Sequence, residues 1–79
     1  MASPHKVQDV TVIDGTLRMR VDGVMHEVNL RKSSRRLRNA TSEQCANLEV
    51  SASGYGIHWP DVDEDITVDG LIRGVVVDW

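Results

Sequence analysis

Residues 10–29, which read VTVIDGTLRMRVDGVMHEVN, decide the first half of the fold. They hold two Asp-Gly pairs, Asp14-Gly15 and Asp22-Gly23, each between segments in which apolar and polar residues alternate. Asp-Gly in such a setting is the strongest short-range signal for a two-residue hairpin turn with positive φ. The stretch therefore predicts a three-stranded antiparallel meander.

The two turns also fix a register that side-chain chemistry can check. The pairs implied are Val12 with Leu17, Val10 with Met19, Val21 with Val24, Met19 with His26, and Leu17 with Val28. The apolar partners then share one face, while Arg18 lies across from Glu27 on the polar face. Two independent turns that agree on one two-sided sheet support this register.

After residue 30 the alternation ends, and the sequence predicts one or two short helices. Leu37 and Ala40 have helical spacing after a serine pair that can cap the first turn. Thr41 opens the sequence TSEQ, which matches a capping box and predicts a second helical turn that carries Cys45 inward.

The second half predicts a β-hairpin, an acidic loop and a terminal strand. Alternation over 48–52 and 57–59 flanks the turn sequence SGYG, and Pro60 ends the hairpin because it has no N–H to donate. Residues 61–74 are expected to form an acidic loop and a short helical turn. Residues 75–79, VVVDW, have strong β-propensity and predict a C-terminal strand. The chain is thus expected to be a single α+β domain over 1–79.

Length and composition narrow the class of protein. The 79 residues allow one small domain, and the lack of Phe leaves an aliphatic core. The single cysteine cannot form an internal disulfide, which favours a reducing compartment. No apolar run has the length of a membrane span, and the first residues lack an apolar signal segment. A cytoplasmic protein without a membrane partner is expected.

Three patterns suggest metal binding or catalysis, but in each case other features of the sequence argue against that function. Asp61, Asp63 and Asp65 have the spacing of EF-hand calcium ligands, but Ile66 and Ile72 occupy the positions that need Gly and Glu. The three histidines lack zinc-ligand spacing, and His26 is expected to be a half-buried residue of the apolar face.

A buried Cys45 offers no nucleophile, and so small a chain has little material for a water-excluding pocket. We expect no catalytic, cofactor-binding or metal-binding residue, and no enzyme.

The net charge is −3, but the basic and acidic residues are concentrated in two separate blocks of the sequence. The basic block is Arg31, Lys32, Arg35, Arg36 and Arg38, and the acidic block is Asp61, Asp63, Glu64, Asp65 and Asp69. The two blocks either face each other within the fold or form separate surfaces for different partners.

The segment from Ser53 through Trp59-Pro60 to Ile72 resembles a bacterial family known as domain of unknown function 2442. The shared pattern is a glycine-containing turn, Ile-x-Trp-Pro and an acidic stretch, matched here by Ile57, Trp59, Pro60, Asp63, Asp65, Ile66 and Leu71. The resemblance covers about residues 7–73. It implies a compact α+β domain and an antitoxin-like or accessory role in a two-gene module.

These observations favour a non-catalytic protein-binding domain. The candidate partner-binding residues are Trp59, Asp61, Asp63, Glu64 and Asp65, with Arg31, Arg35, Arg36 and Arg38 in the basic block. Trp59 has a second interpretation, as the main aromatic residue of the core. The candidate residues for self-association into a homodimer are Val75, Val76, Val77 and Trp79. The alternative function is a nucleic-acid-associated regulator that uses the basic segment 31–38; a small enzyme comes third.

Overall fold

The computed structural model describes residues 5–74, which form two antiparallel sheets and four short helices. The first sheet contains β1 (Val7–Ile13), β2 (Thr16–Val21) and β3 (Val24–Asn29) in that order. The helices α1 (Leu30–Ser33), α2 (Arg35–Arg38) and α3 (Ser42–Ala46) follow. The second sheet contains β4 (Glu49–Val50), β5 (Gly56–Trp59) and β6 (Glu64–Thr67), and α4 (Val68–Arg73) comes last. The predicted α+β class is confirmed.

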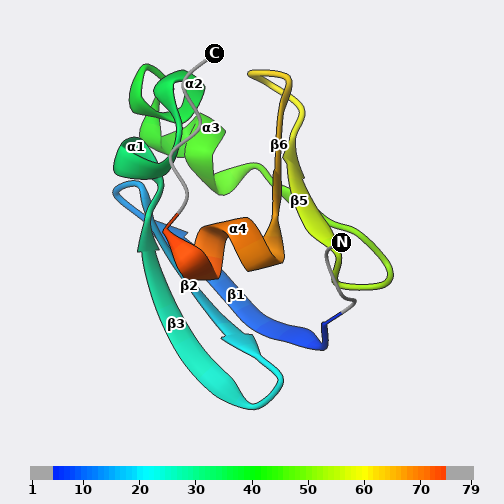
Figure 1. The fold of residues 1–79 in the computed structure, drawn as a ribbon. Helices are drawn as coiled ribbons and strands as arrows, with labels where there is room; N and C mark the ends of the chain where they lie inside the picture. Colours follow the sequence, from blue (N-terminus) through cyan, green and yellow to red (C-terminus); the bar gives the residue numbers. More distant parts are fainter. Residues whose placement is uncertain (1–4, 75–79) are drawn as a thin grey trace.

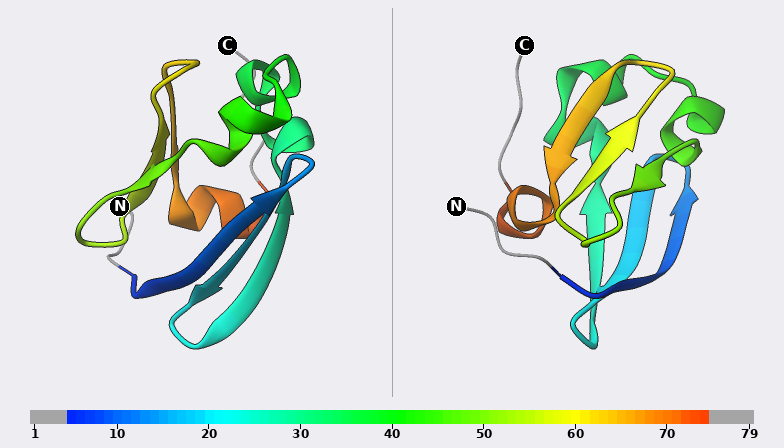
Figure 2. Two further views of the ribbon diagram at one scale, coloured as in Figure 1. Left: turned by 180° about the vertical axis from the view of Figure 1, so that it is seen from behind. Right: turned by 90° about the vertical axis from the view of Figure 1, so that its right-hand side faces the viewer.

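The two sheets enclose one core (Figure 1). Helix α4 fills the space between them at one end, and α1, α2 and α3 close the other end. The right-hand view of Figure 2 shows the second sheet in front of the first, with its outer face toward the viewer. Fully buried core side chains come from every layer: Leu17, Met19, Leu30, Leu37, Cys45, Ile57, Trp59 and Val68. None of the helices within residues 5–74 is long and apolar enough to span a membrane.

Both Asp-Gly turns form as predicted, with positive φ at Asp14 and Asp22 and at the glycine that follows each. The pairing of β2 with β3 matches the predicted register throughout, including Arg18 opposite Glu27. His26 lies opposite Met19 and is half-buried.

The pairing of β1 with β2 departs from the prediction at one point. Gln8 pairs with Arg20 and Thr11 with Arg18, so β1 has one extra residue opposite Met19. This β-bulge places Asp9 at a φ of 53° and brings Val7 opposite Val21. The predicted one-to-one pairing of Val10 with Met19 is therefore replaced by a bulge in which Asp9 and Val10 both lie opposite Met19.

The helical segments follow the capping signals in the sequence. The Ser34 hydroxyl accepts a hydrogen bond from the Leu37 N–H and caps α2. Thr41 and Gln44 form the predicted capping box of α3, and Cys45 is fully buried. Burial raises the pKa of the Cys45 thiol above its ordinary value.

The acidic stretch differs from its prediction. The β4–β5 hairpin forms and ends at Pro60, but Glu64–Thr67 is strand β6 rather than loop, so the second sheet has three strands. The strand forms because Glu64 and Ile66 both point into the core, where Glu64 accepts a hydrogen bond from the Ser34 hydroxyl. The predicted C-terminal strand over 75–79 lies outside the described residues.

Candidate functional site

The outer face of the second sheet carries two rows of side chains that cross all three strands. Strand pairing aligns Glu49, His58 and Asp65 in one row. The adjacent row runs from Ser51 through Gly56 to Thr67, where the Ser51 N–H donates to the Gly56 carbonyl. Because residues alternate along a strand, the buried Ile57, Trp59, Glu64 and Ile66 occupy the opposite face.

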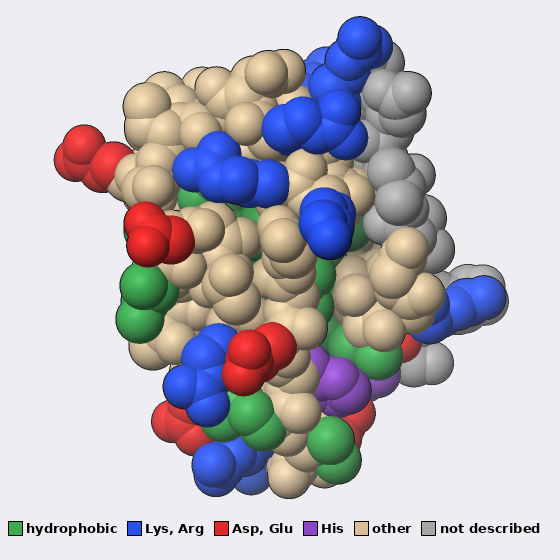
Figure 3. Space-filling view, turned by 90° about the vertical axis from the view of Figure 1, so that its left-hand side faces the viewer, with side chains coloured by type: hydrophobic (Ala, Val, Ile, Leu, Met, Phe, Trp, Pro, Cys, Tyr) green, Lys and Arg blue, Asp and Glu red, His purple; other side chains and the backbone are tan. Residues whose placement is uncertain are grey.

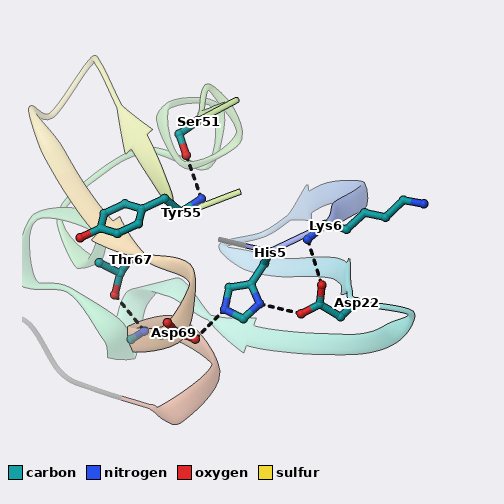
Figure 4. A network of polar contacts seen from close by, with 8 residues as sticks. His5, Lys6, Asp22, Ser51, Tyr55, Thr67 and Asp69 are labelled. Carbon is teal, nitrogen blue, oxygen red and sulfur yellow. Dashed lines mark hydrogen bonds and ion pairs between the residues drawn. The ribbon is translucent and has the colours of Figure 1, made fainter. Parts of the chain in front are cut away.

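A hollow of about 330 Å³ opens on this outer face. We call it the Gly56 hollow; its lining residues are Glu49, Val50, Ser51, Tyr55, Gly56, Ile57, His58, Asp65, Ile66 and Thr67. Gly56 contributes no side chain to the row that runs from Ser51 to Thr67, and this leaves space between these two residues. The Tyr55 side chain, 47% exposed, walls one side and extends toward Thr67 in Figure 4.

Acidic groups dominate the charge of the hollow. Glu49 and Asp65 are exposed, and neither Lys nor Arg is among the lining residues. Asp65 Oδ1 lies 2.9 Å from His58 Nδ1. Within the part of the chain that the structure describes, the Glu49 carboxylate has no hydrogen-bond or ion-pair partner. The face therefore presents carboxylate charge that the protein leaves largely unneutralised.

A histidine at the start of the described chain braces this site from the side. His5 Nδ1 lies 2.6 Å from Asp22 Oδ2, and His5 Nε2 lies 2.6 Å from Asp69 Oδ1. Figure 4 shows both contacts as dashed lines. We call these three residues the His5 clasp. It joins the β2–β3 turn to α4. The backbone N–H of His5 also donates to the Ser53 carbonyl at 3.1 Å, so the clasp holds the loop that carries Tyr55.

The clasp requires a protonated histidine. A neutral imidazole has one N–H, whereas two carboxylates on the two ring nitrogens call for two donors. Hydrogen bonds to Asp22 and Asp69, in that order of size, raise the pKa of His5. Two hydrogen bonds lower the pKa of Asp22. The bond to His5 has the larger effect, and the bond from the Lys6 backbone N–H has the smaller one.

Two of the predicted contact residues lie in the core. Trp59 is fully buried, and its indole N–H donates to the Cys45 carbonyl at 2.9 Å. Glu64 is 1% exposed. The expectation that these side chains meet a partner is corrected, since neither has surface to offer; Trp59 is the main aromatic residue of the core.

The other acidic candidates stay at the surface. Asp61 and Asp63 are exposed in the β5–β6 turn, and Asp65 lies on the outer face of the second sheet. The Asn47 amide donates to the Asp61 carboxylate at 2.8 Å. Of these three acidic residues, Asp65 alone lines the Gly56 hollow.

The basic block is partly engaged within the fold. The Arg31 guanidinium donates to the carbonyls of Arg38 and Ala40, at 3.1 and 2.9 Å. Arg36 donates to the Asp63 carbonyl, so the basic and acidic blocks meet there, and Arg35 and Arg36 make further contacts. Lys and Arg side chains gather in the upper part of the face seen in Figure 3, which is the end that holds the first three helices in Figure 1.

A second groove, of about 290 Å³, lies between β3, α1 and α4. It is lined by His26, Glu27 and Ser33 among others, but no hydrogen bond joins His26 to a hydroxyl or carboxylate of the described residues. Cys45 is buried against the Leu37 carbonyl. The described residues also contain no group of three or more His, Cys, Asp or Glu arranged to hold a metal. Neither His26 nor Cys45 therefore forms a nucleophile–base pair with another described residue.

Sequence reasoning missed most of the hollow. Glu49, Tyr55, His58 and Thr67 were not proposed as site residues. The alternation of His58 with the apolar Ile57 and Trp59 was a usable signal, because it places His58 on the outer face. The His5 clasp had no local signal, since its partners lie 17 and 64 positions away.

The fold and site define a small α+β domain with an open acidic face. Residues 7–76 match the family described as protein of unknown function (DUF2442), and the chain belongs to this family. It is also similar to the crystal structure of a protein of unknown function from Rhodospirillum rubrum ATCC 11170, with 22% identity and a TM-score of 0.76. That match covers 90% of this chain and 88% of the other, and it shows a shared fold. A search of the curated proteins finds no match.

Proposed function

We propose that this protein is a non-catalytic binding domain that receives a protein partner on the outer face of its second sheet. The observation that carries the proposal is the Gly56 hollow, an open cavity with an aromatic wall and two exposed carboxylates on a three-stranded sheet. Surfaces that bind ligands combine concave apolar walls with a few placed polar groups. Asp61 and Asp63, exposed beside this face, add negative charge that would attract a basic partner.

The resemblance to the family supports a more specific role. We propose an antitoxin-like or accessory component of a bacterial two-gene module, acting in the cytoplasm with the neighbouring gene product as partner. An acidic surface that covers a basic partner fits such a role, because charge complementarity speeds association and selects the partner.

Co-purification from the native host tests the binding face. The double variant Glu49→Lys/Asp65→Lys reverses two charges on the second sheet, and Asp9→Lys/Glu27→Lys reverses two on the first. We expect the wild-type chain and the first-sheet variant to retain the same partner, and the second-sheet variant to lose it. Circular dichroism checks that both variants fold. Retention of the partner by the second-sheet variant would refute the proposed face.

The alternative is a nucleic-acid-associated regulator that uses the basic block. The gathering of Lys and Arg side chains on the face in Figure 3 favours this candidate, whereas the internal contacts of Arg31 and Arg36 count against it. A gel shift over a salt series decides the matter: phosphate neutralisation shows first at low salt. Absence of DNA or RNA binding there would remove this alternative.

Self-association through Val75, Val76, Val77 and Trp79 stays a prediction. Sedimentation of the full chain against a chain truncated after Gly74 tests it. A dimer that becomes a monomer on truncation is expected; two monomers at high micromolar concentration would rule out the tail as an interface.

A further inference from the structure

We infer that the Gly56 hollow binds the side chain of an arginine or lysine carried by an extended segment of the partner. The inference rests on the proposed function and names the chemistry that the site would recognise. Three features of the hollow support the inference independently: its shape, its charge and its aromatic wall.

The shape comes from one missing side chain. Gly56 sits between Ser51 and Thr67 in the middle strand, and its φ lies outside the left-handed region that requires glycine. A Cβ at this position would lie 3.3 Å from the Ile66 carbonyl oxygen, so alanine would be accommodated after a shift of a few tenths of an ångström. Glycine therefore leaves a depression that a partner side chain can enter.

The charge selects a cation. Glu49 and Asp65 lie two strand spacings apart, about 10 Å, on either side of His58. A cation held above this row has a carboxylate on each side. His58 contacts one of them, Asp65, at 2.9 Å, and no lysine or arginine of the protein lines the hollow. Carboxylates bind guanidinium and ammonium groups through charge-assisted hydrogen bonds, which are stronger than neutral ones.

The walls suit the remainder of such a side chain. The half-exposed Tyr55 ring offers a π-face to a cation. The Tyr55 ring and the Thr67 methyl group also line the hollow, and the methylene stem of arginine or lysine can pack against them. An acidic side chain would gain the apolar contact but would meet the charge of Glu49 and Asp65, so the site favours basic segments.

The tested probe is a pair of five-residue peptides, acetyl-Val-Thr-Arg-Thr-Val-amide and the same peptide with citrulline in place of arginine. Citrulline keeps the shape of arginine and removes its charge. Each is titrated into the full ¹⁵N-labelled chain while backbone amide shifts are followed by NMR. We expect the arginine peptide to shift amides of β4, β5 and β6 around the hollow, with a Kd roughly tenfold or more below that of the citrulline peptide.

Variants connect the binding to the named groups. Asp65→Asn and Glu49→Gln should each weaken binding of the arginine peptide several-fold, and Gly56→Val should abolish it by filling the hollow. Glu27→Gln, on the outer face of the first sheet, should leave the Kd unchanged. The amide spectrum of each variant shows whether it folds, and the two carboxamide variants keep the test decisive if the valine variant does not.

The outcomes separate this inference from the proposed function. Equal binding of the two peptides at the hollow would overturn the preference for a cation while leaving a peptide-binding face intact. No shift with either peptide, or shifts confined to other surfaces, would overturn the inference. The proposed function would still be decided by co-purification with the charge-reversed variants.

Discussion

The two sheets of this protein have the same number of strands and each buries one face, yet their outer faces differ. On the first sheet Arg18 lies 3.6 Å from Glu27 and Arg20 lies 3.5 Å from Asp9, so opposite charges are paired across strands. On the second sheet Glu49 and Asp65 face outward, no Lys or Arg lines the hollow beside them, and a glycine leaves space between the strands. The comparison teaches that two sheets of equal strand number can differ in how their surface charges are matched, and the proposed binding face is the sheet whose charges lack a Lys or Arg partner.

The inner faces of the two sheets also differ in the side chains that pack in the core. The first sheet contributes aliphatic side chains from long strands fixed by two Asp-Gly turns. The second sheet has strands of two to four residues and depends on Trp59, whose ring is fully buried and whose N–H is satisfied by the Cys45 carbonyl. The second sheet should therefore be the more sensitive of the two to a single core substitution.

The largest expected effect is that of Trp59→Ala. Removing the main aromatic side chain leaves a cavity and an unpaired carbonyl, and should lower the free energy of unfolding by about 3–5 kcal/mol. Chemical denaturation measures the loss. Tyr55→Ala, in the exposed β4–β5 loop of the same sheet, is the control and should cost less than about 1 kcal/mol. Comparable losses for both variants would contradict the assignment of Trp59 to the core.

Glycines in loops of the two sheets make a second contrast. A Cβ at Gly54 would lie 1.7 Å from the His5 carbonyl oxygen, whereas one at Gly23 would meet nothing within 4 Å. Both residues have positive φ. Gly23→Ala should cost roughly 1 kcal/mol of stability from backbone conformation, and Gly54→Ala roughly 2–3 kcal/mol because the chain at His5 must move as well. Equal thermal shifts for the two variants would show that the close approach is unimportant.

The His5 clasp predicts a smaller, pH-dependent contribution. The pKa of His5 is raised, so its stabilisation is fully present below about pH 6.5 and is lost as the pH rises through the folded-state pKa. The pKa of Asp22 is lowered, so its share is present above its ordinary value of 3.8 and is lost as the pH falls through the folded-state pKa. Denaturation midpoints of wild type and His5→Gln should differ most in the mildly acidic window and converge at alkaline pH. A difference that grows toward alkaline pH would contradict a protonated His5.

The smallest effect concerns the matched face of the first sheet. The Arg18–Glu27 pair is exposed, with 54% and 63% of the two side chains accessible. A double-mutant cycle with Arg18→Ala and Glu27→Ala should give a coupling energy below about 0.5 kcal/mol, decreasing further with salt. A coupling above about 1 kcal/mol would mean that this face contributes to folding more than its exposure implies.

The first sheet could be predicted in detail because Asp-Gly fixes both the turn and the register. The bulge at Asp9 could not, since a positive φ at a non-glycine residue has no local signature there. Strand β6 was missed because the acidic residues around it resemble a solvated loop. The burial of Glu64 depends on Ser34, 30 positions earlier, and contacts at that distance leave no mark in a local pattern.

The most direct test of the binding face is site-specific photo-crosslinking in the native host. A photoreactive phenylalanine analogue replaces either Tyr55, in the β4–β5 loop beside the hollow, or Met25 in β3 of the first sheet, which have similar exposures of 47% and 41%. The structure predicts a discrete protein adduct from position 55 and none from position 25. An adduct from position 25 alone, equal adducts from both, or none from either would contradict the assignment of the second sheet as the binding face.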